Sequence, residues 1–283
     1  MTDVTLAIAL PLLGAFLLPV TARRGLHWFG ALLGPTVLAL SALVLFGNAS
    51  VYEAPYAIAL GGFAPPLGIS LYVDPLALLF ALTVPLTTLL LWPGDDGDAG
   101  IRRQSLTLLL ASALTGLALS GDLFNLYVFY ELAAVASYGL AAGGGSSPGF
   151  VAAFRYLLIS ALGSVFGLMG IALIYFQTGT LNLAHLATLS GQLANPQGLA
   201  AFAMLVIGFG VKAELFPVNG WVPEVYGAAS KRVAALLAGL ASKLAVLAIV
   251  RILLLVFPHE EARQLLLVLG ILGVISGELA AYQ

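Results

Sequence analysis

The sequence predicts an all-α integral membrane protein with about nine membrane-spanning helices, and three observations predict it. Of the 283 residues, 61% are apolar and only 8% are charged, whereas soluble domains carry about 25% charged residues. The mean hydropathy is +1.05. The apolar residues form continuous runs close to the ~20 residues that a spanning helix needs, without the alternation of a membrane β-barrel.

Nine runs are candidate spans: residues 4–20, 26–46, 74–92, 104–120, 122–142, 150–176, 198–216, 232–257 and 264–281. The first run follows Met-Thr-Asp, which lacks the positive charge of a secretory signal, so we expect this span to be retained. The last run carries Gln264 and Glu278 near its ends. Residues 51–73 combine glycines and prolines with short β-prone segments, and predict an extracytoplasmic hairpin.

The orientation follows from three basic pairs in short loops, Arg23–Arg24, Arg102–Arg103 and Lys231–Arg232. With nine spans, all three pairs lie on one side of the membrane. Basic residues in short loops favour the cytoplasmic side. We therefore expect the N-terminus outside, the C-terminus inside, and one membrane domain over residues 1–283.

The composition excludes several functions. The chain has no cysteine, so it can form neither disulfides nor cysteine-ligated iron–sulfur clusters. Its three histidines are scattered along the sequence, and no cofactor or metal is expected. The net charge of −2 argues against a nucleic-acid partner.

Charged residues inside the spans are the first functional candidates, because a charge at the centre of a span costs about 3 kcal/mol on insertion scales. Glu131, Lys212 and Lys243 lie near the middle of their spans and could form a buried polar row. The alternative is an ion-pair network with a structural role. Arg155 and Arg251 lie nearer the ends of their spans, where snorkelling to the interface is the alternative to function.

The stretch GFGVKAELFPVNGWVPEVYG predicts a helix broken at Pro217. This proline removes a backbone donor and disfavours helix just before it. Broken helices at membrane depth are common beside ion sites in transporters. Lys212 would precede the break by five residues. Glu214 would face another side of a regular helix and pair with a neighbouring helix or chain, or it would lie in the Pro217 break itself. The alternative interpretation is that residues 217–230 form an inner loop.

Three residues of the fifth run could support Glu131. Tyr127 and Tyr138, at −4 and +7, share its helical face and could hydrogen-bond to the carboxylate or to a water chain, with packing as the alternative. Asp122 starts the run and is expected to be its N-cap, the other interpretation being a proton access point.

Two stretches resemble a known family over most of residues 50–283. GDLFNLYVFYELAAVASYGL resembles the fifth helix of the D subunit of multisubunit sodium/proton (Mrp-type) antiporters. The superfamily includes the antiporter-like subunits of respiratory complex I and membrane-bound hydrogenases. VKAELFPVNGWVPEVYGAASKRVAALLAGLASKLAVLAIVRILLL is similar to the family's seventh and eighth helices, usually K-A-x-x-F-P-x-x-x-W-L-P-[DE].

The resemblance implies two inverted five-helix repeats, helices four to eight and nine to thirteen, with helices seven and twelve broken. Residues 1–103 would hold helices one to three, 104–257 the first repeat with its proton half-channel, and 264–283 the start of an incomplete second repeat. Glu131, Lys212 and Lys243 fall on the family's charged positions of helices five, seven and eight.

The sequence departs from the family pattern in two places. After WVPE it lacks the usual proline and carries Lys231–Arg232 instead. The sequence also stops inside what would be the ninth helix. Either another polypeptide supplies the second repeat, or this is a truncated or degenerate copy.

The resulting hypothesis is a proton-translocating subunit of a larger complex in a bacterial or archaeal cytoplasmic membrane, in which sodium/proton exchange is one form of the activity. Glu131 would switch the proton affinity of Lys212, and Lys243 would take the proton next. A charge pair at about 4 Å is worth roughly 4 kcal/mol at an effective dielectric of 20, comparable with about 2.3 kcal/mol per charge per 100 mV of membrane voltage.

Two other classes of function remain open. The chain could be an assembly subunit without transport, which the missing repeat favours. A redox enzyme in its own right is disfavoured, because no glycine-rich nucleotide loop, cysteine or histidine pair is present. Any NADH:quinone oxidoreductase activity would then belong to partner subunits in the complex. The expected partners are other membrane subunits, the lipid bilayer, and protons or sodium ions.

Overall fold

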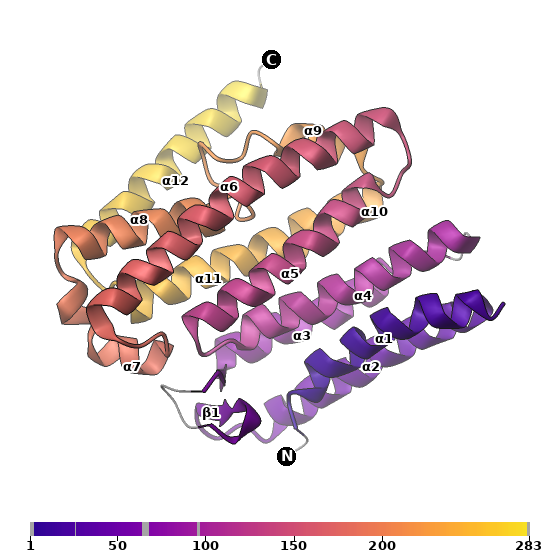
Figure 1. The fold of residues 1–283 in the computed structure, drawn as a ribbon, viewed down its shortest axis with the longest axis horizontal. Coiled ribbons are helices and arrows are strands. Elements are labelled where there is room, and N and C mark those ends of the chain that lie inside the picture. Colours follow the sequence, from indigo (N-terminus) through magenta and orange to yellow (C-terminus); the bar gives the residue numbers. More distant parts are fainter. Residues whose placement is uncertain (1–2, 26, 64–67, 95–96, 282–283) are drawn as a thin grey trace.

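The computed structural model describes residues 3–25, 27–63, 68–94 and 97–281. The helices lie side by side in one bundle, with α1 and α2 at one edge and α12 at the opposite edge (Figure 1). The first half consists of α1 Leu6–Arg23, α2 His27–Ser50, β1 Tyr56–Ala59, the short η1 Leu60–Gly62, β2 Ser70–Val73, α3 Pro75–Leu90 and α4 Gly97–Leu119.

The second half holds three long helices, several short ones and a continuous helical run with a π-helical segment. Its elements are α5 Leu123–Ala142, α6 Ser147–Thr178, α7 Leu183–Thr188, η2 Ser190–Leu193, α8 Pro196–Gly210, α9 Val222–Ala228, α10 Lys231–Leu236, the π-helical η3 Leu237–Ala241, α11 Ser242–Leu255 and α12 Glu260–Ala281. The run from α10 to α11 is unbroken and turns through the π segment just before Lys243.

The chain is a mostly helical integral membrane protein, as the sequence predicts. A helix covers most of each of the nine predicted runs. Within the described residues, six helical segments are long and apolar enough to cross a membrane: Leu6–Arg23, Trp28–Ser50, Leu123–Ala142, Ser147–Thr178, Lys231–Leu255 and Glu260–Leu279. The apolar helices α3 and α8 are shorter. The number of spans and their orientation stay predictions.

The predicted hairpin is present between α2 and α3. Strands β1 and β2 pair antiparallel, with Tyr56 opposite Val73 and Ala59 opposite Ser70. The Gly121 N–H donates to the Ser70 carbonyl at 2.9 Å, which joins β2 to the turn before α5. The hairpin therefore belongs to the same packed unit as the helices. Its position outside the membrane remains a prediction.

Helices α6 and α8 approach closely because glycines line their contact. Gly163 and Gly167 of α6 face Gly208 of α8. A Cβ atom at Gly208 would lie 2.7 Å from the Gly167 Cα and 2.9 Å from the Gly163 carbonyl oxygen. Small residues allow this backbone-to-backbone packing in membrane helices. The contact fixes the last turn of α8 against α6, just before the chain leaves its helical path.

We predict that Gly208→Ala destabilises the protein by about 1–3 kcal/mol. The added methyl group would overlap backbone atoms of α6, which cannot move away by a change of rotamer. The thermal unfolding of the purified protein measures this effect. Gly270→Ala on α12 is the control, because its added Cβ meets nothing within 4 Å. Equal unfolding temperatures for both variants would contradict the prediction.

The broken helix begins earlier than the sequence predicts. Helix α8 ends at Gly210, and turns occupy residues 211–221 before α9. Lys212 is therefore inside the break, and Glu214 is not part of a regular helix. The physical reason is Glu214 itself, whose φ of 59° is left-handed and cannot continue a right-handed helix. The Leu215 N–H then turns back to the Gly210 carbonyl at 3.0 Å.

Candidate functional site

Lys212 is the centre of a buried polar site between α5, α6 and the break after α8. Its side chain is almost enclosed, with 3% of the residue exposed. The ammonium donates to the Ser160 hydroxyl of α6 at 3.3 Å. It also lies 3.7 Å from the centroid of the Tyr130 ring of α5, where the face of the ring attracts a cation. The lysine is thus held by one hydroxyl and one aromatic face.

Tyr130 fixes this arrangement, and it was not predicted from the sequence. Its hydroxyl donates to the Gly208 carbonyl, and its ring meets Phe209 edge-on at 4.8 Å. Tyr130 thereby ties α5 to the last turn of α8. Its role is hidden in the sequence because it is adjacent to Glu131 and therefore lies about 100° away around the helix, off the face that carries the carboxylate.

Glu131 lies near Lys212 but does not pair with it. Among the described residues, the Glu131 Oε1 atom is buried and has no hydrogen-bond partner, while Lys212 bonds to Ser160. The two charges interact electrostatically without contact. The direct ion pair expected from the sequence is therefore open in this structure. Burying a carboxylate oxygen without a hydrogen bond costs free energy. The nearby Lys212 ammonium is a group that could satisfy this oxygen of Glu131.

Two predicted supporting tyrosines reach α6, the helix whose Ser160 binds Lys212. The Tyr127 hydroxyl lies 2.7 Å from the Ser164 hydroxyl, and the Tyr138 hydroxyl lies near the Ser160 side chain. These serines lie one turn apart on α6. The tyrosines are connected to the site through α6 hydroxyls, and among the described residues neither bonds to the buried oxygen of the Glu131 carboxylate.

The break is held by a tryptophan and a carboxylate. The Trp221 indole N–H donates to the Val211 carbonyl at 2.9 Å, and its ring stacks on Tyr156 of α6 with centroids 3.9 Å apart. Glu214 accepts a hydrogen bond from the Tyr226 hydroxyl of α9. The backbone that presents Lys212 is therefore anchored on both sides of the bend, although Pro217 itself is exposed.

Lys243 is not buried in this chain, which corrects the sequence prediction. It is exposed on α11, and within the described part of the chain its ammonium donates to the neighbouring Ser242 hydroxyl alone, at 3.4 Å. The buried side of α11 is formed by Leu244, Leu247 and their neighbours. The opposite stripe, with Val246 and Leu254, faces away from the described bundle. Mid-depth position in a span does not fix which side of the helix is covered.

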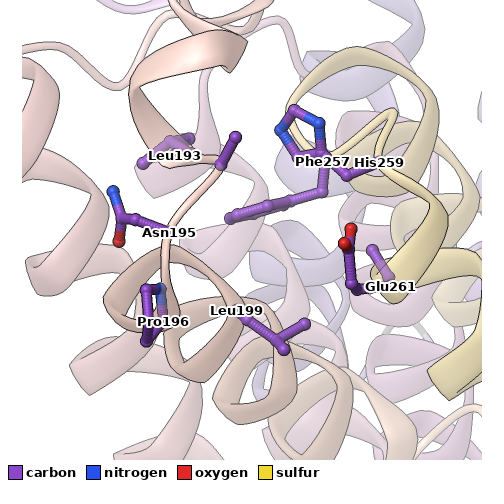
Figure 2. A pocket seen from close by; sticks show the side chains of 9 residues that line it. Leu193, Asn195, Pro196, Leu199, Phe257, His259 and Glu261 are labelled. Carbon is purple, nitrogen blue, oxygen red and sulfur yellow. The ribbon is translucent and has the colours of Figure 1, made fainter.

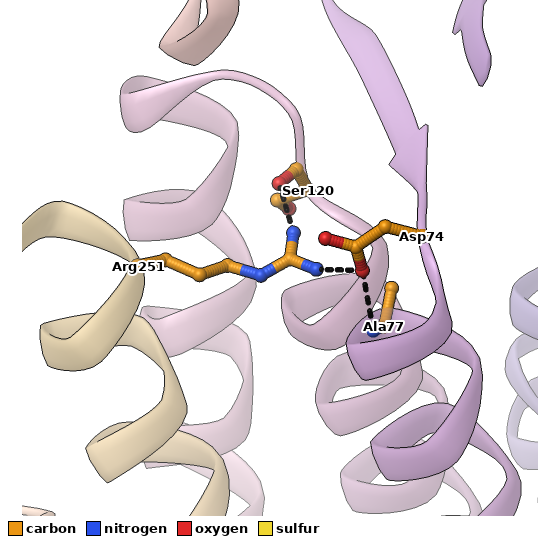
Figure 3. A network of polar contacts seen from close by, with 4 residues as sticks. All are labelled: Asp74, Ala77, Ser120 and Arg251. Carbon is orange, nitrogen blue, oxygen red and sulfur yellow. Dashed lines mark hydrogen bonds and ion pairs between the residues drawn. The ribbon is translucent and has the colours of Figure 1, made fainter. Parts of the chain in front are cut away.

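Arg251 forms a buried ion pair with a residue from the first half of the chain (Figure 3). Its guanidinium donates to the Asp74 carboxylate at 2.6 Å and to the Ser120 carbonyl at 3.5 Å. Asp74 also caps α3 by accepting from the Ala77 N–H at 2.6 Å. Arg251 is 3% exposed, so it does not snorkel. Its contacts in the described chain place it with the hairpin end of α3, apart from the Lys212 site.

Asp74 was not predicted from the sequence, although an aspartate directly before Pro75 is a typical helix start. Asp122 is the N-cap of α5, as predicted, and accepts from the N–H groups of Phe124 and Asn125 at 2.9 and 3.0 Å. Arg155 pairs with Glu224 of α9 at the protein surface. Whether Arg155 snorkels to the interface stays a prediction.

A separate cavity of about 350 Å³ lies between η2, the start of α8 and the start of α12. Its lining is mainly apolar, with Asn195, His259 and Glu261 as the polar residues (Figure 2). The Nε2 atom of His259 lies 3.0 Å from the Ser190 carbonyl oxygen and is hydrogen-bonded to it. None of the residues around Lys212 lines this cavity.

The fold and the site define an α-helical integral membrane protein with a buried ionisable cluster at a broken helix. Residues 120–283 match the family described as NADH:quinone oxidoreductase/Mrp antiporter, TM. The chain belongs to this family, which confirms the resemblance of its fifth, seventh and eighth helices.

Two relatives illustrate the range of the family. The chain is 35% identical over 276 residues to the NADH-quinone oxidoreductase subunit N of Desulforudis audaxviator, covering 93% of this chain and 54% of that one. It is 34% identical over 229 residues to the D subunit of the Na(+)/H(+) antiporter of Bacillus subtilis, covering 78% and 46%.

A solved structure is similar throughout. A chain of the membrane-bound sulfane sulfur reductase, an archaeal respiratory membrane complex, superimposes with a TM-score of 0.85 at 34% identity, covering 94% of this chain and 56% of that one. The present chain spans about half the length of the curated relatives it matches.

Proposed function

We propose that this chain is a proton-translocating part of a multisubunit membrane complex, and that Lys212 takes up and releases the proton. The observation that carries this proposal is a buried ammonium at a helix break, with Glu131 close by but not in contact. Burial penalises the charged amine and a nearby carboxylate favours it. Movement of Glu131 toward Lys212 would load the proton, and movement away would release it.

The energies support such a switch. Closing a pair at about 4 Å is worth roughly 4 kcal/mol at an effective dielectric of 20. A membrane voltage supplies about 2.3 kcal/mol per charge per 100 mV. The two quantities are similar, so opening the pair can be coupled to the gradient. The hydroxyls of Ser160, Ser164, Tyr127 and Tyr138 provide donors and acceptors beside the lysine.

Glu131→Gln tests the proposal. We expect proton uptake to fall at least about tenfold, which corresponds to about 1.4 kcal/mol in the barrier, because glutamine keeps the shape but cannot change its charge. Everted membrane vesicles that carry the chain with the products of the neighbouring genes provide the assay, read out with a pH-sensitive dye. Glu53→Gln, an exposed carboxylate before the hairpin, is the control. Unchanged uptake in Glu131→Gln would refute the switch.

Lys243 is proposed as the onward acceptor once a further membrane segment covers its side of α11. A lysine that faces lipid at mid-span costs about 3 kcal/mol on insertion scales. Helix α12 is also poorly covered, since only 6% of its apolar window is buried. Both features support additional membrane segments, in the same or another polypeptide, as partners of this face. Sodium/proton exchange and redox-driven pumping are both compatible with the Lys212 site.

A transport-inactive assembly subunit is the second candidate. The observation in its favour is that no contact in the described chain leads from Lys212 to Lys243. In either case, we assign electron transfer to other subunits, since the sequence has no cysteine with which to ligate an iron–sulfur cluster. The proposed location is a bacterial or archaeal cytoplasmic membrane.

A further inference from the structure

Glu214 follows Lys212 by two residues in the break, and the Glu131–Lys212 switch does not use it. It is the one non-glycine residue with a positive φ in the described part of the chain. A glutamate gains nothing locally from the left-handed region, which favours glycine, asparagine and aspartate. Backbone strain of this kind persists where surrounding contacts impose it, and it clusters at functional sites. The contacts of the Glu214 side chain therefore need an explanation.

The carboxylate of Glu214 accepts the hydroxyl hydrogen of Tyr226 on α9. Tyr226 meets the Trp221 ring edge-on at 5.9 Å, and Trp221 stacks on Tyr156. Both Glu214 and Tyr226 are half-buried, so this pair lies between the protein interior and its surface. A half-buried carboxylate can exchange a proton with water and still belong to the break that carries Lys212.

A row of phenols connects the Glu214 pair with Lys212. Tyr156 meets Tyr138 edge-on at 4.9 Å, and the Tyr138 hydroxyl lies near Ser160, the hydrogen-bond partner of the Lys212 ammonium. On its other side Tyr156 stacks on Trp221, which donates to the carbonyl of Val211, the residue before Lys212. Tyr156 interacts electrostatically with both Glu131 and Glu214. Glu131 belongs to α5 and Glu214 to the break, so Tyr156 is influenced by carboxylates from both elements.

The Glu214 pair lies toward the predicted inner side of the membrane. Tyr226 belongs to α9, and the chain runs from α9 directly to Lys231–Arg232, the basic pair expected on the cytoplasmic face. Helix α9 packs beside the beginning of α6, close to the end of the bundle that holds the start of α10 (Figure 1). Lys212, in contrast, contacts Ser160 near the middle of α6.

We infer that Glu214 is a further proton-carrying residue of this site, placed between Lys212 and the predicted inner surface with Tyr226 as its positioning partner. This inference rests on the proposed function. When the site is loaded from the inner side of the membrane, the Glu214 carboxylate takes up one proton from water and becomes neutral. It then gives the proton toward the neutral Lys212 amine, which becomes an ammonium, and the carboxylate is restored. The reverse order releases the proton on the same side.

Three variants test this role in everted vesicles that carry the complete complex: Glu214→Gln, Glu214→Asp and Tyr226→Phe. Loss of a proton-transfer group costs about a hundredfold in rate at the low end of its usual range, so we expect Glu214→Gln to lower proton uptake by at least about tenfold. Glu214→Asp keeps an ionisable group and should retain most of the uptake. Tyr226→Phe should give an intermediate loss, because the carboxylate is kept but loses its hydrogen bond.

The amount of assembled complex and one control variant distinguish a proton-carrying role of Glu214 from a structural role. Glutamine still accepts the Tyr226 hydrogen bond, so the amount of assembled complex should be unchanged in Glu214→Gln. Glu224→Gln removes a carboxylate ten residues further on that pairs only with the surface residue Arg155, and should transport normally. Equal losses in Glu214→Asp and Glu214→Gln, or lost assembly in both, would mean a structural role and overturn the inference.

Lys212→Ala, measured in parallel, distinguishes the proposed function of the chain from the role of Glu214. If Lys212→Ala stops uptake while Glu214→Gln transports normally, the proposed function stands and the role of Glu214 is refuted. If Lys212→Ala transports normally, the proposed function itself fails. Loss in Lys212→Ala together with loss in Glu214→Gln and rescue in Glu214→Asp supports both.

Discussion

Lys212→Ala is expected to reduce proton uptake to the level of vesicles that lack the complex. The side chain is the one buried amine of the described site, and its removal takes away the proposed proton carrier that binds Ser160. Lys212→Arg should have the same effect, since a guanidinium keeps its charge and cannot be deprotonated in a protein. This second variant separates the need for a positive charge from the need for proton exchange.

The measurement is the initial rate of dye quenching in everted vesicles, normalised to the amount of assembled complex. Lys231→Ala is the matched control, because Lys231 is exposed at the start of α10. Full transport by Lys212→Arg would show that the charge alone is required, and the load-and-release mechanism would be wrong. Full transport by Lys212→Ala would leave the assembly subunit as the better interpretation.

Breaking the Arg251–Asp74 pair is expected to destabilise the protein by about 3–5 kcal/mol, the usual cost of leaving one partner of a buried ion pair uncompensated. Asp74→Asn keeps the size of the side chain and part of the cap of α3, but leaves the buried guanidinium without a counter-charge. Loss of the cap in Asp74→Ala should cost about 1 kcal/mol more. Thermal unfolding of the purified complex measures both values.

The double variant Asp74→Asn with Arg251→Gln provides the critical comparison. It removes both charges, so it should be more stable than Asp74→Asn alone. Arg263→Gln, an exposed basic residue of α12, is the control and should unfold like the unmodified protein. If Asp74→Asn has no effect on unfolding, the ion pair contributes nothing, and the contact between α11 and the hairpin end of α3 must be held by apolar packing.

Structural features that depend on residues close together in the chain could be predicted from the sequence. Apolar runs predicted the helices, because the length of a run and its burial in lipid are local properties. The Asp122 cap was predicted for the same reason, since its hydrogen bonds go to Phe124 and Asn125. The hairpin followed from the glycines, prolines and β-prone segments between two spans.

Features set by distant residues could not be predicted. The partner of Arg251 lies 177 residues earlier in the chain. The helix ends at Gly210 rather than at Pro217 because Glu214 takes a left-handed backbone conformation, and the partner of its side chain, Tyr226, belongs to another helix. Lys243 lies at the expected depth, but its exposure depends on which segments cover α11. The charged positions were thus identifiable from sequence, whereas their pairings were not.

The glycine contact between α6 and α8 determines which part of the site is free to move. Sliding α8 along α6 would carry the Gly208 backbone past atoms that already touch it, and it would pull the Tyr130 hydroxyl from its carbonyl. Rotation of the Glu131 side chain breaks no hydrogen bond at its buried oxygen. In the proposed mechanism, the transport cycle can therefore run on side-chain torsions within a stationary backbone, at the rate of rotamer exchange and rehydration rather than of helix displacement.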